Sequence, residues 1–193
     1  ISACLVGSEM CIRDSIYNAR QVVDKIGHLC DYIFFDSAWV GYEQFIPMMK
    51  DCSPLLLELG PEDPGIFVTQ SVHKQQAGFS MTSQVHKKDS HIKGQDRYVP
   101  HKRVNNAFMM HASTSPLYQL FAALDVNAKM HEGEAGKKLW VEAVKTVIET
   151  RKQILRNCHY IRPLVPPVVN GKKWEDGDTE KMANDMDSVS YTH

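Results

Sequence analysis

The chain has 193 residues, of which 43% are hydrophobic and 23% charged, the composition of one modest globular domain or of a piece of a larger protein. Its 22 Lys and Arg residues nearly balance its 23 Asp and Glu residues, so net charge gives no reason to expect nucleic acid or an anionic membrane as a partner. No apolar run approaches the roughly 20 residues of a membrane-spanning helix, so no membrane is expected either.

The two ends of the chain are excluded from the fold prediction. Residues 2–15, SACLVGSEMCIRDS, show no clear helix or strand period and are similar to translated sequencing-adapter sequence, as are residues 188–193, SVSYTH. We treat residues 1–15 and 188–193 as non-native, as a fusion scar would be treated. The native window is then about residues 16–187, and we expect it to be an internal piece of a longer protein.

The first native elements have an α/β rhythm. Residues 18–29 predict an amphipathic helix with Asn18 as its N-cap, because apolar residues recur at helical spacing. Residues 31–36, DYIFFD, predict a buried strand, and residues 66–71, IFVTQS, predict a second one after a Pro- and Gly-rich turn. Helices alternating with apolar strands are typical of a mainly parallel sheet flanked by helices.

The rest of the window is mostly helical. Residues 79–85 predict a further strand, and the polar residues 87–95 predict a solvated loop. Pro100 predicts the start of a helix whose apolar face holds Val104, Ala107 and Phe108, and Pro116 predicts the start of another. A long helix is expected from about 135 to 156, followed by a proline-rich extended segment and a tight turn at Asn170-Gly171.

The spacing of the cysteines bears on the redox compartment, and the spacing of the histidines bears on metal binding. The five cysteines are odd in number and form no CxxC pair, which favours free thiols in a reducing cytoplasm. A metal-binding module is the alternative from a different class, built on His86, His91, His101 and His111. None of the usual zinc spacings is present among them, so no metal is predicted.

An acid and an amine follow the two predicted strands. Asp36 ends the first strand, and Lys74 ends or closely follows the second. Ligands of open α/β sheets bind at the carboxyl ends of the strands. A carboxylate and a primary amine at that edge suit pyridoxal 5′-phosphate (PLP), which needs a lysine for its Schiff base and an acid beside its ring nitrogen. This spacing alone does not separate such a site from ordinary surface residues.

The sequence segments that contain these residues are more specific than their spacing. Residues 35–45 (FDSAWVGYEQF), 71–75 (SVHKQ) and 87–94 (KKDSHIKG) resemble the bacterial PLP-dependent ornithine decarboxylases of the Orn/Lys/Arg decarboxylase family. Residues 105–116 (NNAFMMHASTSP) and 165–174 (VPPVVNGKKW) extend the resemblance over essentially the whole native window. The resemblance implies an aspartate-aminotransferase-like fold. Residues 16–160 would be the C-terminal part of the PLP-binding large domain, and residues 161–187 would begin the connection to a C-terminal small domain.

The resemblance also implies roles for individual residues. Lys74 would be the Schiff-base lysine, and Asp36 would bind the pyridine nitrogen. Ala38 and Trp39 would pack beside the ring. Its phosphate and neighbouring atoms would be contacted by Ser71 and His73, and His73 is also a candidate for proton transfer.

Ser113 matches a hydroxyl position that reaches the phosphate of the partner subunit, so a homodimer or higher homo-oligomer is expected. The implied reaction is decarboxylation of L-ornithine to putrescine and CO2 in the cytoplasm. Lysine or arginine decarboxylation by the same family is the alternative. The 193-residue chain alone is expected to be inactive, because the phosphate-cradling loop and the ring-stacking residue would lie upstream of it.

Overall fold

The structure, a computed structural model, describes residues 3–6, 16–112 and 114–189. These residues form two compact units. The first contains the chain up to residue 44 together with residues 51–129, and the second contains residues 45–50 together with the chain from residue 130 onward. In the described part, no helix is both long and apolar enough to cross a membrane.

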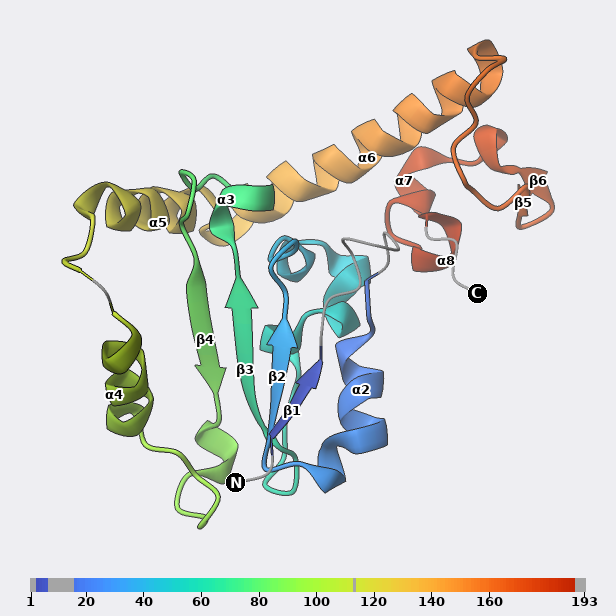
Figure 1. Cartoon of the computed structure of the whole chain (residues 1–193). Helices are drawn as coiled ribbons and strands as arrows, with labels where there is room; N and C mark the ends of the chain where they lie inside the picture. The colour runs from blue at the N-terminus through green and yellow to red at the C-terminus, as the bar shows by residue number, and fades with distance from the viewer. Residues whose placement is uncertain (1–2, 7–15, 113, 190–193) are drawn as a thin grey trace. The chain divides into compact units, whose positions relative to one another are not determined.

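A four-stranded sheet in the order β1-β2-β3-β4 lies at the centre of the first unit (Figure 1). Its strands are β1 (Ala3–Val6), β2 (Tyr32–Asp36), β3 (Gly65–Gln70) and β4 (Gln84–Lys88). The β1–β2 and β2–β3 pairs are parallel, as predicted, whereas β4 runs antiparallel to β3. The described sheet is therefore mixed. Strand β1 falls within the residues excluded from the sequence prediction, which expected no element there.

Helix α2 (Ala19–Ile26) covers one face of this sheet. Asn18 caps the helix as predicted, because its side chain accepts a hydrogen bond from the Gln21 amide. The helix ends three residues earlier than predicted, where a 3-10 turn begins at Gly27. The core between helix and sheet consists of Ala19, Val23, Cys30, Ile33, Phe35, Leu57, Ile66 and Val68. Burial of these apolar side chains is what fixes β2 and β3 side by side.

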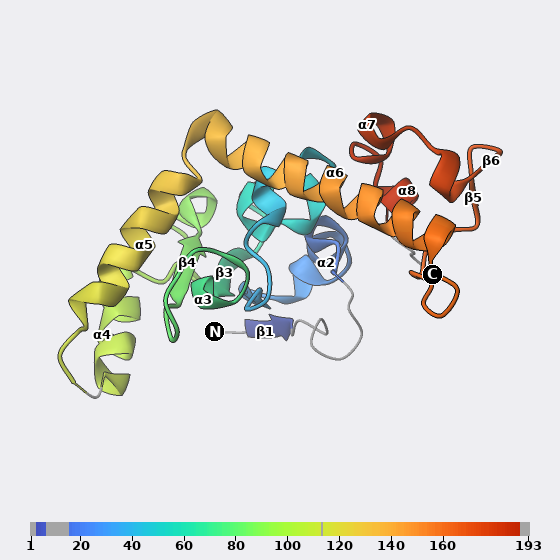
Figure 2. The ribbon, with the colours of Figure 1, turned by 90° about the horizontal axis from the view of Figure 1, so that it is seen from above.

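The opposite face of the sheet borders an apolar cavity of about 300 Å³. Phe34 and Phe67 stack there with ring centroids 5.8 Å apart, and Val104 and Phe108 of helix α4 (His101–His111) line the other wall. Figure 2 shows α2 and α4 on opposite sides of the sheet. Helix α4 begins after Pro100, as predicted, but none of its residues is buried. Helix α5 (Tyr118–Met130) follows, and only Ala123 and Asn127 are buried in it.

Two sequence predictions around β4 are wrong. The strand expected over residues 79–85 forms instead at Gln84–Lys88. The first two residues of the solvated loop expected over residues 87–95 therefore belong to β4, and Asp89 and Ile92 within it are buried. The inward-facing residues of β4 are polar, so alternation of apolar residues did not reveal the strand. Lys88, for example, donates from Nζ to the backbone oxygens of Leu55 and Leu57.

The second unit is built on the long helix α6 (Gly133–Asn157), which agrees with the predicted helix. The hairpin β5 (Val168–Val169) and β6 (Lys172–Lys173) turns at Asn170 and Gly171, both with positive φ as the predicted tight turn requires. Helices α7 (Thr179–Met182) and α8 (Met186–Val189) follow. Ile148, Trp174, Met182 and Ala183 form the core of this unit.

Short 3-10 turns connect the main elements, at Gly27–Leu29, Glu43–Phe45, Pro47–Cys52, Pro54–Leu56, Ser90–Ile92 and Trp174–Asp176. The prediction that every cysteine is a free thiol is wrong for Cys30, which is disulfide-bonded. Cys52 and Cys158 are free.

Candidate active site

The two strand ends singled out from the sequence are neighbours. Strands β2 and β3 are parallel, and Asp36 stands opposite Thr69 in their register. Lys74 follows β3 in the short helix α3 (Val72–Gln75), at the same edge of the sheet (Figure 1). The carboxyl edge of one strand pair therefore carries both residues, which is the place where open α/β sheets bind ligands.

The Asp36 carboxylate is held in a defined orientation. Its Oδ1 accepts from the backbone amide of Ala38 at 3.1 Å and from Thr69 Oγ1 at 3.3 Å. Asp36 thus presents a fixed carboxylate at the strand end.

The Lys74 amine lies over an aromatic ring. Its Nζ is 4.9 Å from the centroid of the Trp39 ring, within the range of a cation–π contact. Lys74 is otherwise exposed, and Trp39 is partly buried in the loop that follows β2. The structure therefore brings together the predicted lysine and one of the two residues predicted to lie beside the cofactor ring.

His73 and Ser71 flank the lysine. His73 Nδ1 lies 2.8 Å from the backbone oxygen of Thr82. Because a carbonyl oxygen only accepts, Nδ1 carries the hydrogen and Nε2 is the basic nitrogen of the neutral ring. Ser71 is the N-cap residue of α3, but its hydroxyl makes no capping hydrogen bond. Ser113 lies outside the described residues.

A buried polar group next to this edge was missed by the sequence analysis. Gln70, the last residue of β3, is 1% exposed, and its Oε1 lies 3.0 Å from Gln84 Nε2 and 3.1 Å from His86 Nε2. Burial lowers the pKa of His86 and favours a neutral ring that donates from Nε2. The sequence feature that could have revealed this buried group is Gln70 itself, a polar residue that faces the same side of β3 as the inward-facing Ile66 and Val68.

A second set of buried polar groups includes Ser37, the residue after Asp36 in the chain. The Tyr17 hydroxyl is 2.7 Å from Ser37 Oγ, and Glu43 is fully buried, with Oε2 accepting from the Gly41 amide at 2.5 Å. Burial raises the pKa of Glu43 and raises that of the Cys52 thiol to about 11. Both groups therefore favour their neutral forms.

The four histidines of the alternative metal-binding hypothesis do not lie together. His86 contacts Gln70, while His91 Nε2 is 3.0 Å from the backbone oxygen of Pro64. His101 and His111 are exposed at the two ends of α4. Among the described residues, no three His, Cys, Asp or Glu side chains are placed to share a metal ion.

The chain is similar to several bacterial decarboxylases. It is 73% identical to an ornithine decarboxylase of Haemophilus influenzae over 177 residues and 73% identical to an inducible ornithine decarboxylase of Escherichia coli K12 over 172 residues. These matches cover 92% and 89% of this chain but only 25% and 24% of the relatives. The chain therefore spans about a quarter of their length. Identity falls to 38% for the inducible lysine decarboxylase and 34% for the biodegradative arginine decarboxylase of Escherichia coli K12.

The chain is also similar to a solved decarboxylase structure. A lysine decarboxylase of Francisella novicida, LdcF, matches 89% of this chain and 23% of its own with a TM-score of 0.71 at 29% identity. The match to the family described as Orn/Lys/Arg decarboxylase, major domain, runs over residues 9–191 and reaches a few residues into both excluded ends, whose non-native origin stays a prediction. The chain belongs to this family, as part of its major domain.

Proposed function

We propose that this chain is the segment of a PLP-dependent ornithine decarboxylase that supplies the Schiff-base lysine, Lys74, and the acid facing the ring nitrogen, Asp36. The observation that carries the proposal is that both residues lie at the carboxyl edge of the parallel strands β2 and β3. Membership of the Orn/Lys/Arg decarboxylase family supports the reaction class. The whole enzyme would convert L-ornithine to putrescine and CO2.

The residues present fit the cofactor. When bound, PLP supplies an electron sink for the pair left on Cα as CO2 departs. Asp36 would keep a proton on the ring nitrogen, and its contacts with Thr69 and Ala38 would hold the carboxylate in place for that task. Lys74 would bind the cofactor aldehyde through its amine and later displace the product amine.

The neighbouring side chains would orient the reacting groups. Trp39 would pack beside the ring together with Ala38, since its indole already lies over the Lys74 amine. His73 would move a proton at Nε2, because Nδ1 is held by the Thr82 backbone oxygen. Ser71 would direct its hydroxyl, which is not used for capping, toward the phosphate.

Ornithine is the proposed substrate because the ornithine decarboxylases are far more similar to this chain than the lysine and arginine enzymes are. Lysine or arginine decarboxylation remains the second candidate. A homo-oligomeric parent enzyme in the cytoplasm is also proposed, with Ser113 reaching the phosphate in the partner subunit's site.

The test is a chimaera in which residues 16–187 replace the matching segment of the Haemophilus influenzae ornithine decarboxylase. We expect CO2 release from ornithine to exceed release from lysine and arginine, and Lys74→Ala to abolish it. Faster release from lysine or arginine would refute the substrate assignment. The isolated 193-residue chain, assayed alongside with added PLP, is expected to release no CO2.

A further inference from the structure

Helix α3, which carries Lys74, is too short to hold its own orientation. It contains four residues, Val72–Gln75, and Lys74 and Gln75 are both exposed. A single helical turn is unstable in water, because forming it orders several residues for one hydrogen bond. The direction in which Lys74 points is therefore set by contacts at the two ends of the turn.

The beginning of the turn is held from the strand side. The His73 amide donates to the Thr82 backbone oxygen at 3.3 Å, and the ring nitrogen Nδ1 of the same residue reaches that oxygen at 2.8 Å. The Lys74 amide donates to the Ser71 oxygen at 3.0 Å. These contacts fix the start of α3, and the Gly78 amide ties the chain after it to the Val72 oxygen at 3.3 Å.

The end of the turn is also held by one side chain from a distant helix. Asn127 of α5 accepts at Oδ1 from the Ala77 amide at 3.0 Å and donates from Nδ2 to Gln76 Oε1 at 2.9 Å. Asn127 is 6% exposed. Asparagine is a poorer helix former than alanine, so helix propensity does not explain its presence inside α5. An acceptor and a donor on one short side chain are what the two contacts require.

Gln76 also contacts the loop that contains Trp39. Gly41 has a φ of +126°, and a Cβ there would overlap Gln76 Nε2 and lie 3.2 Å from Gln70 Nε2. The Gln76 amide thus packs directly against the Gly41 backbone, two residues after Trp39. Asn127, Gln76 and Gly41 form a continuous connection, here called the amide clasp, between α5, the Lys74 turn and the Trp39 loop.

We infer that Asn127 is a positioning residue that holds Lys74 in line with Trp39 and the cofactor ring through the amide clasp. This rests on the proposed function, in which Lys74 carries the Schiff base. Asn127 itself does not touch the reacting atoms. Its loss lets the end of α3 move, so that the amine is presented in the productive direction for a smaller fraction of the time.

The test uses the chimaera with Asn127→Ala, Asn127→Asp and Gln76→Ala. Asn127→Asp keeps the acceptor for Ala77 but loses the donor to Gln76. Gln119→Ala, an exposed change on the same helix, is the matched control. Amide hydrogen exchange of residues 74–78 is measured in the cofactor-free enzyme, followed by kcat, KM and the pH midpoint of the Schiff-base absorption band in the loaded enzyme.

Asn127→Ala is expected to speed exchange at residues 76–78 about tenfold, to lower kcat about tenfold with KM little changed, and to shift the absorption midpoint, because two hydrogen bonds are lost. Gln76→Ala should show a smaller effect of the same kind, and Asn127→Asp should lie between Asn127→Ala and the wild type. Adding Gln76→Ala to Asn127→Ala should change little more, since the clasp is already open.

The inference is overturned if Asn127→Ala shows the same hydrogen exchange, kcat and absorption midpoint as the wild type. If Asn127→Ala does not fold, Gln76→Ala decides in the same way, since its side chain is only partly buried. The proposed function has a separate readout, because a Schiff-base band that survives Lys74→Ala refutes that proposal. If Lys74→Ala loses the band while Asn127→Ala behaves as the wild type, only the inference about Asn127 and the amide clasp is refuted.

Discussion

The Asp36 carboxylate and its two donors are the most informative residue-scale feature of this chain. The loop amide of Ala38 and the hydroxyl of Thr69 both reach Oδ1, so strand pairing itself sets the orientation of the carboxylate. The charge of Asp36 and the orientation of its carboxylate can therefore be changed separately. Replacing Asp36 removes the charge, whereas replacing Thr69 changes only the support.

In the chimaera, Asp36→Asn is expected to lower kcat/KM by at least about 100-fold, the usual cost of losing a preorganised electrostatic partner. Thr69→Val, the matched control, removes one hydrogen bond of about 1 kcal/mol and should lower kcat/KM only about fivefold. Steady-state kinetics with ornithine measures both. Equal losses in the two variants, or full activity in Asp36→Asn, would remove Asp36 from its proposed role.

Glu43 gives a pH-dependent prediction. Burial raises its pKa in the folded chain above the ordinary value of 4.5, so the folded state binds the proton more tightly than the unfolded state. The stability that this group contributes is complete below a pH of about 4.5 and is lost as pH rises through the raised pKa. Glu43→Gln stays neutral throughout.

The melting temperature of the Glu43→Gln chimaera, measured relative to the parent chimaera, should therefore rise as the pH increases above about 4.5. Thermal unfolding followed at several pH values checks this. A difference that stays constant, or that falls with increasing pH, would show that Glu43 is not held neutral by burial.

At the scale of elements, residue patterns predicted helices and strands whose buried face is apolar and misplaced strand β4, whose buried face is polar. Helices α2 and α6 and strands β2 and β3 were expected because their apolar residues recur with the right period. Strand β4 was misplaced because Gln84 and His86, on its inward side, are stabilised by Gln70 rather than by apolar packing.

The candidate site divides in the same way. Lys74 and Asp36 were predicted because they follow apolar strands and lie in segments that resemble a known family. Asn127 could not be found, because its partners Gln76 and Ala77 lie about fifty residues away and only the folded chain brings them together. Partners that distant leave no periodic signal in a single sequence.

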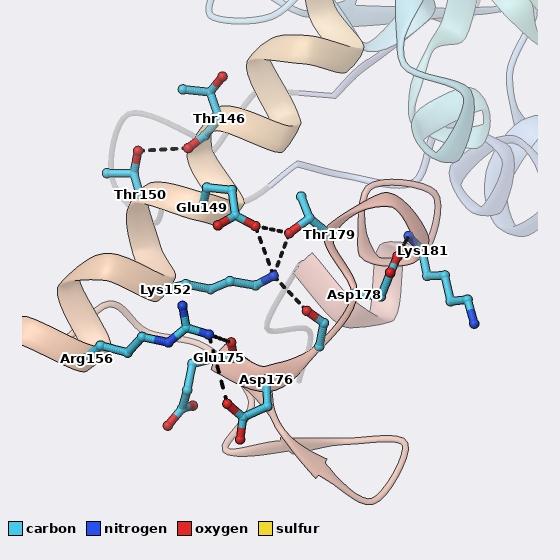
Figure 3. A network of polar contacts seen from close by, with 11 residues as sticks. Thr146, Glu149, Thr150, Lys152, Arg156, Glu175, Asp176, Asp178, Thr179 and Lys181 are labelled. Carbon is cyan, nitrogen blue, oxygen red and sulfur yellow. Dashed lines mark hydrogen bonds and ion pairs between the residues drawn. The ribbon is translucent and has the colours of Figure 1, made fainter.

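In the second unit, a buried lysine ties α7 to α6. Lys152 is 4% exposed, and its Nζ donates to the Gly177 oxygen at 2.7 Å and to Thr179 Oγ1 at 2.5 Å, while pairing with Glu149 at 3.2 Å (Figure 3). Lys145, on the same helix, pairs with Glu142 and Glu180 nearer the solvent. The two lysines form a natural comparison.

Lys152→Met should destabilise the second unit by about 1–3 kcal/mol, because the Gly177 oxygen and the Thr179 hydroxyl lose a buried donor. Lys145→Met is expected to cost less, since exposed ion pairs contribute little. Amide hydrogen exchange over residues 174–183 in the chimaera measures the difference. Equal exchange rates in the two variants would contradict a supporting role for the buried lysine.

On the scale of the whole molecule, this chain is about a quarter of the proteins it resembles, yet it carries the residues on which the proposed chemistry depends. The lysine, the acid and the aromatic ring lie at one sheet edge, whereas the remainder of a complete site would come from other parts of the parent and from the partner subunit. The proposed Schiff-base lysine therefore lies in this chain.

The most direct test is therefore chemical identification of that lysine. The chimaera loaded with PLP is reduced with borohydride, digested, and its peptides are mapped by mass spectrometry. A pyridoxyl phosphate adduct on Lys74, absent from a Lys74→Arg control, is the predicted result. An adduct on another lysine, or one that persists in Lys74→Arg, would contradict the account.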